Sequence, residues 1–364
     1  MRLDLVRPDD AAWDRWLGGV PRDVYHTAGY HVFSQEMGEG DAYLVIVGDR
    51  RHGLAWPYLL RPVADVQGLA GSDARDVSSV YGYPGPVAWG CHPGDPFLQQ
   101  AWRRIHALWR EQGAVAAFTR FHPLLGNASL VAGLRLPSQP DDGPGPLVAE
   151  GATVSVDCTL ADEDATRLYA RALRQHIARA REAGLATTHD EEWEGLAAFA
   201  RLYSETMARN RAASYYRFSE ADFERLRSGL AGLLHLLVVR VNDTVAAAGL
   251  FTEFQGIVQA HLIASDEIYR PLSPAKLLLD DARRWARQRG NSTLHLGGGR
   301  GASEDSLLRF KSEFSPRRHV FHTGRWILDG SRYRELCAAH LARVSDPRAL
   351  DQEFFPAYRA PVVG

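Results

Sequence analysis

Two lysines are the residues of this sequence whose type and setting point most directly to chemistry. Only Lys276 and Lys311 are lysines among the 42 lysine and arginine residues, and an ammonium differs from a guanidinium in geometry and in ease of deprotonation. Phe310 and Phe314 share one helical face, so the side chain of Lys311 must project from another face. Partly desolvated there, its amine could hold a carbonyl oxygen or a phosphate, or exchange a proton.

The segment around Lys276 combines two signals for the start of a helix. Ser273 is a favoured N-cap, and Pro274 is favoured at the first helical position. A helix is therefore expected directly after a strand, with Lys276 in its first turn, where a cation opposes the helix dipole. Two interpretations stay open: a solvated lysine on a capped helix, or a cation placed for a ligand at the sheet edge.

Other polar and aromatic clusters lie in loops and at strand ends. Asp76 precedes Tyr81 and Tyr83 in a loop rich in glycine and proline, which suits either a packed corner or a binding loop. Arg120 and His122 stand at the exit of a buried strand, where His122 fits a structural role better than a catalytic one. The remaining candidate binding residues are Arg209, Arg211, Tyr216 and Arg309.

Several classes of protein are excluded by what the sequence lacks. It contains no GxSxG elbow, Walker A loop or HExxH motif, and its histidines do not fall at metal-ligand spacing. The three cysteines are far apart and cannot form a disulfide framework, which favours the cytoplasm. A net charge of −2 excludes a polybasic protein, and no apolar run approaches the roughly 20 residues of a membrane helix. We expect no metal site and no membrane span.

The elements that must position these residues predict two α/β units. A segment rich in proline and glycine, 137–146, separates two halves of the 364-residue chain. We expect domains at 1–150 and 151–330, each a mixed, mostly antiparallel sheet flanked by helices, and a C-terminal helix and tail at 331–364. The main expected elements are hairpins at 43–60 and 233–254 and helices at 96–112, 162–182, 191–210 and 274–289.

The motifs in this order resemble the Fem-like branch of the GNAT superfamily, over residues 22–328. Two of them are the most specific, namely Leu272-Ser273-Pro274-Ala275-Lys276-Leu277-Leu278 and Arg309-Phe310-Lys311. The others are Tyr25-His26-Thr27 with Tyr30, Asp76 with Tyr81-Gly82-Tyr83 and Gly85-Pro86, Arg120-Phe121-His122-Pro123-Leu124-Leu125, and Leu173-Arg174-Gln175-His176-Ile177-Ala178-Arg179-Ala180.

This resemblance implies tandem GNAT-like domains that transfer an amino acid from aminoacyl-tRNA to an amine. The acceptor amine belongs to a peptidoglycan precursor or a peptide-like metabolite, and no cofactor is bound permanently. Lys311 is implied to stabilise the oxyanion, and Asp76, a water molecule or the leaving hydroxyl takes the proton. Arg209, Arg211 and Tyr216 would line the donor or acceptor groove. The long coiled-coil arm of some family members is absent, which favours specialised metabolism over wall assembly.

Two alternatives are compatible with the same residues. An acyl-CoA-dependent N-acyltransferase would need a pyrophosphate cradle, yet residues 269–276 contain no glycine and two prolines without a backbone donor. Side chains of Ser273, Lys276 and Arg270 could bind phosphate in its place. The second alternative is a non-catalytic module that binds a peptide or a glycan. The sequence does not decide the oligomeric state, the amino acid or the acceptor.

Overall fold

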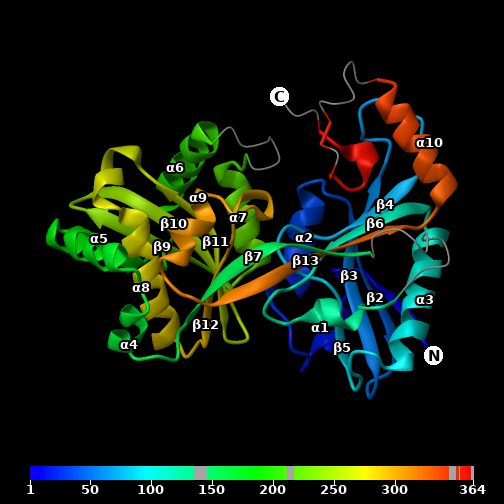
Figure 1. Cartoon of the computed structure of the whole chain (residues 1–364), viewed down its shortest axis with the longest axis horizontal. Helices are drawn as coiled ribbons and strands as arrows, with labels where there is room; N and C mark the ends of the chain where they lie inside the picture. Colours follow the sequence, from blue (N-terminus) through cyan, green and yellow to red (C-terminus); the bar gives the residue numbers. More distant parts are fainter. Residues whose placement is uncertain (135–145, 211–216, 344–349, 352, 362–364) are drawn as a thin grey trace. The chain divides into compact units, whose positions relative to one another are not determined.

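The structure is a computed structural model that describes residues 1–134, 146–210, 217–343, 350–351 and 353–361. The chain divides into two compact units (Figure 1), one formed by Met1–Glu150 with Phe321–Gly364 and the other by Gly151–Val320. The division falls inside two strands, β7 (Leu147–Asp157) and β13 (Arg318–Ile327). Most of the expected linker, 137–146, lies outside the described residues.

The first unit is a sheet of order β1-β2-β3-β4-β6-β13, with β5 paired to β3. Its pairs are antiparallel except β4 with β6. Its other strands are β1 (Leu3–Val6), β2 (Asp41–Gly48), β3 (Gly53–Pro62), β4 (Arg75–Ser78), β5 (Val87–Trp89) and β6 (Ala114–Arg120). Its helices are α1 (Ala12–Leu17), α2 (Ala28–Glu36), α3 (Pro96–Glu111) and α10 (Gly330–Leu341).

The second unit is a sheet of order β7-β12-β11-β10-β9-β8, antiparallel except β11 with β12. Its other strands are β8 (Ala186–His189), β9 (Leu234–Val241), β10 (Thr244–Phe254), β11 (Ile257–Ser265) and β12 (Thr293–Gly298). Its helices are α4 (Asp162–Arg167), α5 (Arg171–Glu182), α6 (Leu196–Arg209), α7 (Glu220–Gly229), α8 (Pro274–Gln288) and α9 (Ser306–Ser312).

The two units repeat one topology. In each, four strands joined in antiparallel order are followed by a helix, α3 or α8, and then by a strand that pairs in parallel with the fourth. The sixth place is taken by β13 in the first unit and by β7 in the second. This arrangement confirms the expected fold class, with a mixed, mostly antiparallel sheet flanked by helices in each unit.

Apolar side chains at helical and strand spacing build a separate core for each unit. In the first, Trp56 stacks on Trp102 with ring centroids 5.3 Å apart and meets Trp109 and Trp326 edge-on, all of them buried. In the second, apolar residues of α5 and α8 pack together against the sheet. Burial of such residues supplies most of the folding free energy, so each unit has its own source of stability.

Two expected helices differ from the observed ones because side chains from elsewhere intervene. The helix expected at 162–182 is broken between α4 and α5, where Tyr169 turns inward and its hydroxyl donates to Asp280 at 3.0 Å. The helix expected from 191 begins at 196 as α6, since the carboxylate of Asp190 accepts from the backbone N–H of Gly195 at 2.7 Å. The expected hairpins are confirmed as β2–β3 and β9–β10.

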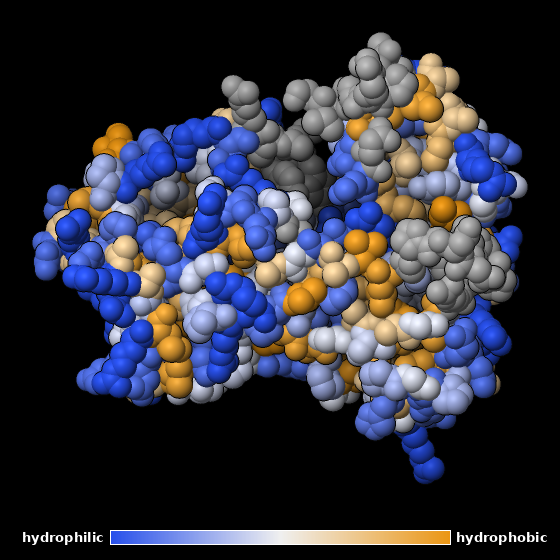
Figure 2. All heavy atoms as spheres, viewed as in Figure 1, coloured by the Kyte–Doolittle hydropathy of each residue, from blue (hydrophilic) through white to orange (hydrophobic). Residues whose placement is uncertain are grey.

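On the face drawn in Figure 2, hydrophilic residues surround scattered apolar ones, as is usual for a folded protein in water. In the described part of the chain, every helix is too short or too polar to cross a membrane.

Candidate functional site

Helix α9 places Lys311, and local sequence explains why the helix forms. Asp305 caps it, because its carboxylate accepts from the backbone N–H of Leu308 at 2.9 Å. Phe314 is buried in the core of the second unit, and Phe310 packs against that core. Lys311 therefore projects from a different face, as the spacing predicts.

The ammonium of Lys311 is directed onto the end of a strand rather than into solvent. Its Nζ donates to the carbonyl oxygen of Gly298, the last residue of β12, at 2.7 Å. Burial lowers the pKa of this amine to about 8, although the charge of Asp305 opposes the shift. Among the described residues, none forms an ion pair with Lys311. The side chain is a desolvated amine, which can hold a developing negative charge or exchange a proton near neutral pH.

The glycine run before α9 is needed by the fold itself. A Cβ at Gly299 would lie 2.0 Å from the carbonyl oxygen of Ser303, and Gly301 has φ +55. Glycine is the residue that tolerates such contacts and such backbone angles. This loop therefore owes its composition to backbone packing, and its glycines are not evidence for a phosphate cradle.

Lys276 has a different environment from Lys311. Its Nζ lies 2.7 Å from Glu313 Oε2 and 2.9 Å from His176 Nδ1, and its side chain is only 13% exposed. Glu313 directly follows α9, so the pair ties α8 to the helix that carries Lys311. Lys276 is thus part of an internal ion pair. Both interpretations that the sequence allowed, a solvated lysine and a cation placed for a ligand, are wrong.

The start of α8 also differs from the expected one. A short 3-10 helix, Glu267–Leu272, separates it from β11. Ser273 does stand at the N-cap position, with φ +54, but its side chain makes no capping hydrogen bond. Its carbonyl oxygen instead accepts from the backbone N–H of Lys276 at 3.0 Å.

The end of α6 meets the loop that leads into α9. Arg209 donates to the carbonyl oxygen of Ser265 at 3.3 Å, and Arg300 donates to Asn210 Oδ1 at 3.1 Å. Arg300 in turn donates its backbone N–H to Asp305 at 3.3 Å. We call Asn210, Arg300, Asp305 and Lys311 the α9 cluster. Arg209 precedes Asn210 and pairs with Glu267 at 3.6 Å.

Sequence reasoning missed three members of the α9 cluster, Asn210, Arg300 and Asp305. The position of Asp305 three residues before Leu308, at the start of a helical pattern, was the one local signal for a cap. Of the other sequence-predicted residues of this unit, Arg309 is exposed on α9, and Arg211 and Tyr216 lie outside the described residues.

Asp76 in the first unit is a structural carboxylate and is poorly suited to be the general base. It is completely buried. Arg61 donates to its Oδ1 at 2.7 Å, and Arg359 donates to its Oδ2 at 2.5 Å. Tyr358 approaches the same Oδ2 at 3.3 Å. Both oxygens already accept from side-chain donors and the carboxylate has no contact with solvent, so the structure argues against the role of base that the sequence suggested for Asp76.

His122 is also held by a buried network. Its Nδ1 accepts from the backbone N–H groups of Leu124 and Leu125, at 3.2 Å each, so its proton is on Nε2. That nitrogen donates to Asp23 Oδ2 at 2.7 Å, with both side chains fully buried. Tyr83 packs edge-on near this ring, at 6.2 Å. The contacts support the structural role that the sequence favoured for His122.

The two other predicted residues of the first unit lie near these. Tyr81 is half-buried in the loop that follows β4. Arg120 is half-buried at the end of β6 and covers the ring of Phe118 at 5.1 Å. These first-unit residues are not assigned to the α9 cluster, which belongs wholly to the second unit.

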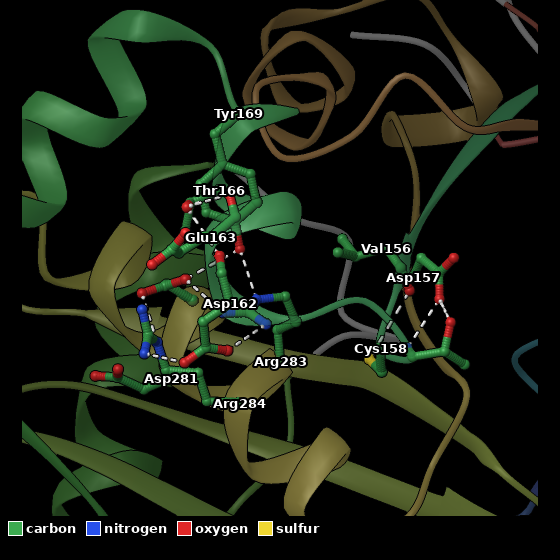
Figure 3. A network of polar contacts seen from close by, with 12 residues as sticks. Val156, Asp157, Cys158, Asp162, Glu163, Thr166, Tyr169, Asp281, Arg283 and Arg284 are labelled. Carbon is green, nitrogen blue, oxygen red and sulfur yellow. Dashed lines mark hydrogen bonds and ion pairs between the residues drawn. The ribbon is translucent and has the colours of Figure 1, made fainter.

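A buried arginine fixes α8 in the second unit (Figure 3). Arg283 is fully buried and donates to Asp162 at 3.0 Å and to the hydroxyl of Tyr169 at 3.0 Å. Arg284 also pairs with Asp162, at 2.5 Å. These bonds join α4 and the residues before α5 to α8. The network therefore sets the position of the helix that carries Lys276.

Comparison with known proteins agrees with this architecture. Residues 167–312 match the family model described as an acetyltransferase (GNAT) domain. The fold is similar to the crystal structure of FemX, with a TM-score of 0.66 and 14% identity over 92% of this chain and 99% of that one. No curated protein matches the chain by sequence.

Two further structures share the fold. One is the C-terminal domain of a protein described as a lysylphosphatidylglycerol synthetase from Agrobacterium fabrum, with a TM-score of 0.54 and 16% identity over 84% of this chain and 88% of that one. The other is a protein of unknown function from Bacteroides thetaiotaomicron, with a TM-score of 0.56 and 12% identity over 89% and 99%. At these identities the likeness shows the fold alone, and this fold is the one that the resemblance to the Fem-like branch of the GNAT superfamily implied.

Proposed function

We propose that this chain, which has the fold of the Fem-like branch of the GNAT superfamily, is an acyltransferase that forms an amide bond. The acyl donor is an aminoacyl-tRNA, and the acceptor is the amine of a peptide-like metabolite or a peptidoglycan precursor. The observation that carries the proposal is the ammonium of Lys311, held at 2.7 Å on the carbonyl oxygen of Gly298 and without an ion-pair partner in the described part of the chain.

The reaction requires a neutral amine and an activated ester. The amine nitrogen attacks the ester carbonyl and forms the new C–N bond, and the carbonyl oxygen becomes an oxyanion. Lys311 donates to that oxyanion. Collapse of the intermediate breaks the ester C–O bond, and the ribose hydroxyl of the tRNA leaves with a proton. Because Lys311 already donates to a carbonyl oxygen in the free protein, its amine is oriented for such a contact before substrate binds.

The proton of the attacking amine needs an acceptor other than Asp76. A water molecule or the leaving hydroxyl can take it, since both are present at the reacting centre. Lys276 has a positioning role, because its ion pair with Glu313 fixes the end of α9. Arg300 in the α9 cluster, and Arg209 beside it in the chain and paired with Glu267, provide cationic groups where the phosphates of a donor could bind.

Acyl-CoA as the donor is the alternative, and the segment before α8 argues against it. Pro271 and Pro274 lack backbone donors. The backbone N–H groups of Ile268 and Tyr269 bond to Asp266, and that of Ser273 bonds to Arg270. Few amides therefore remain to cradle a pyrophosphate. The other alternative, a module that only binds a peptide or glycan, would not require a desolvated amine such as Lys311.

A transfer assay tests the proposal. The protein is incubated with a tRNA pool charged with radiolabelled amino acids and with the small-molecule fraction of a cell extract. Mild alkali hydrolyses the remaining esters but not amides, so alkali-stable label reports amide formation. We expect label with the parent protein and a loss of about 10²–10³-fold with Lys311→Met.

Binding distinguishes the donors. Aminoacyl-tRNA is expected to raise the melting temperature of the parent protein, by the linkage between ligand binding and stability. If CoA raises the melting temperature and aminoacyl-tRNA does not, acyl-CoA replaces aminoacyl-tRNA as the favoured donor. Transfer by a folded Lys311→Met protein at the parental rate would refute the role of that amine.

A further inference from the structure

A cavity of about 460 Å³ lies at the edge of the second unit's sheet, where β8 is the last strand. It lies between the end of β8, the start of β9 and α7. Its polar and aromatic lining includes His189, Glu191, Trp193, Glu224, Arg227 and His235. None of these residues belongs to the α9 cluster, so a ligand site at this cavity is independent of the proposed function.

Two histidine nitrogens face each other at this cavity. Nε2 of His189 and Nδ1 of His235 are 3.3 Å apart. Two imidazole ligands of a tetrahedral zinc ion, each about 2.0–2.1 Å from the metal, are themselves about 3.3 Å apart. Trp285 packs against both rings, with centroids 5.4 and 4.9 Å away. The pair therefore has the spacing of two metal ligands and a rigid support.

A carboxylate lies beside the nitrogen of His235 that points away from His189. Nε2 of His235 lies 3.1 Å from Glu253 Oε2. Arg289 and Asn291 donate to Glu253, at 2.8 and 2.6 Å, and hold this carboxylate in place. With its proton on Nε2, beside this carboxylate, the His235 ring presents the lone pair of Nδ1 towards His189.

A second carboxylate stands on the outer side of His189. Nδ1 of that ring lies 3.4 Å from Glu191 Oε1. Without a metal, the proton shared by the facing nitrogens must come from Nε2 of His189. A cation in place of that proton lets both outer nitrogens donate to carboxylates, the arrangement typical of metal-binding histidines.

We propose that His189 and His235 bind a divalent transition-metal ion of the Zn²⁺ or Ni²⁺ type through these facing nitrogens. The ion takes the place of the proton on Nε2 of His189, and that proton moves to Nδ1 beside Glu191. In the described part of the chain, no group of three or more His, Cys, Asp or Glu residues is placed to hold a metal ion, so the remaining positions go to water from the cavity. The ion would join the end of the edge strand β8 to β9.

Calorimetric titration of the full chain with Zn²⁺ tests this site, together with melting curves. His189→Gln is the main variant, because this side chain is 20% exposed and the substitution is compatible with folding. His92→Gln, at an exposed position of the first unit, is the matched control. We expect His189→Gln to weaken Zn²⁺ binding by at least about tenfold and to abolish the zinc-induced rise in melting temperature, with His92→Gln unchanged.

A measurement on the parent protein removes any dependence on how the variants fold. Diethyl pyrocarbonate modifies accessible histidines, and peptide mapping locates the modified residues. We expect Zn²⁺ to protect His189 and not His92. Equal Zn²⁺ affinity in the parent and His189→Gln proteins, or modification of His189 at the same rate with and without Zn²⁺, overturns the proposal.

Discussion

Replacing Lys311 by methionine should make the protein more stable while it lowers the rate of transfer by about 10²–10³-fold. Methionine keeps an unbranched apolar chain and removes the ammonium, which the fold holds out of water. The pKa of Lys311 falls from 10.5 to about 8 because of burial, and one unit of pKa corresponds to about 1.4 kcal/mol. The charged form is therefore disfavoured in the folded protein by about 3 kcal/mol.

The pH dependence is set by the direction of this shift. The folded pKa lies below the unfolded one, so the destabilisation is complete below pH 8 and diminishes as the pH rises towards 10.5. At pH 7 the buried ammonium lowers the free energy of unfolding of the parent by about 3 kcal/mol. The variant is relieved of this destabilisation but loses about 1 kcal/mol with the hydrogen bond to Gly298. We expect Lys311→Met to be more stable by about 2 kcal/mol at pH 7. Near pH 9.5 the destabilisation by the buried ammonium falls to about 1 kcal/mol, so we expect the variant and the parent to be equally stable.

Urea denaturation at the two pH values measures this difference. Lys276→Met is the matched control, because Lys276 is ion-paired with Glu313 and its removal leaves a half-buried carboxylate without its cation. This control should be less stable than the parent at both pH values. A Lys311→Met protein that is less stable than the parent at pH 7, or whose gain is equal at pH 7 and 9.5, would refute the conclusion that burial of this ammonium destabilises the fold.

Three further predictions concern charged groups. In the parent we expect kcat/KM to decline as the pH rises through about 8, since only a protonated Lys311 stabilises the oxyanion. Lys311→Arg should retain part of the transfer activity and lose this decline; the same decline in the variant would contradict the role of Lys311. Asp76→Asn should lower the free energy of unfolding, measured by urea denaturation, by about 3–5 kcal/mol, because Arg61 and Arg359 lose their buried partner. A loss below about 1 kcal/mol would show that these two ion pairs contribute little to stability. Arg283→Met should destabilise the second unit by a similar amount, measured by calorimetry, and an unchanged transition would show that the network of Figure 3 contributes little.

Elements defined by nearby residues were predicted well from the sequence. The turn at Asn242 and Asp243 produced the β9–β10 hairpin, with Asn242 at φ +51. The helix expected at 274–289 is α8, Pro274–Gln288. These signals extend over one or two turns of chain, so they do not depend on the rest of the fold.

Elements that depend on distant partners were not predictable in this way. The interruption between α4 and α5 arises because Tyr169 bonds to Asp280, a residue 111 positions away. The sequence made Asp76 a candidate base. In the structure its carboxylate instead accepts a hydrogen bond from Arg359, which is 283 positions away in the chain. A sequence pattern shows a titratable residue but not the group that will lie next to it.

The sequence by itself determined which face of α9 carries Lys311, because the spacing of Phe310 and Phe314 assigns the core face. It also determined the order of strands and helices that produces a mixed sheet in each unit. Only the tertiary structure decided that the ammonium of Lys311 is desolvated while that of Lys276 is neutralised by Glu313. The reason is physical: helical periodicity is a property of neighbouring residues, whereas the charge state of a side chain depends on the solvent and partners that folding brings to it.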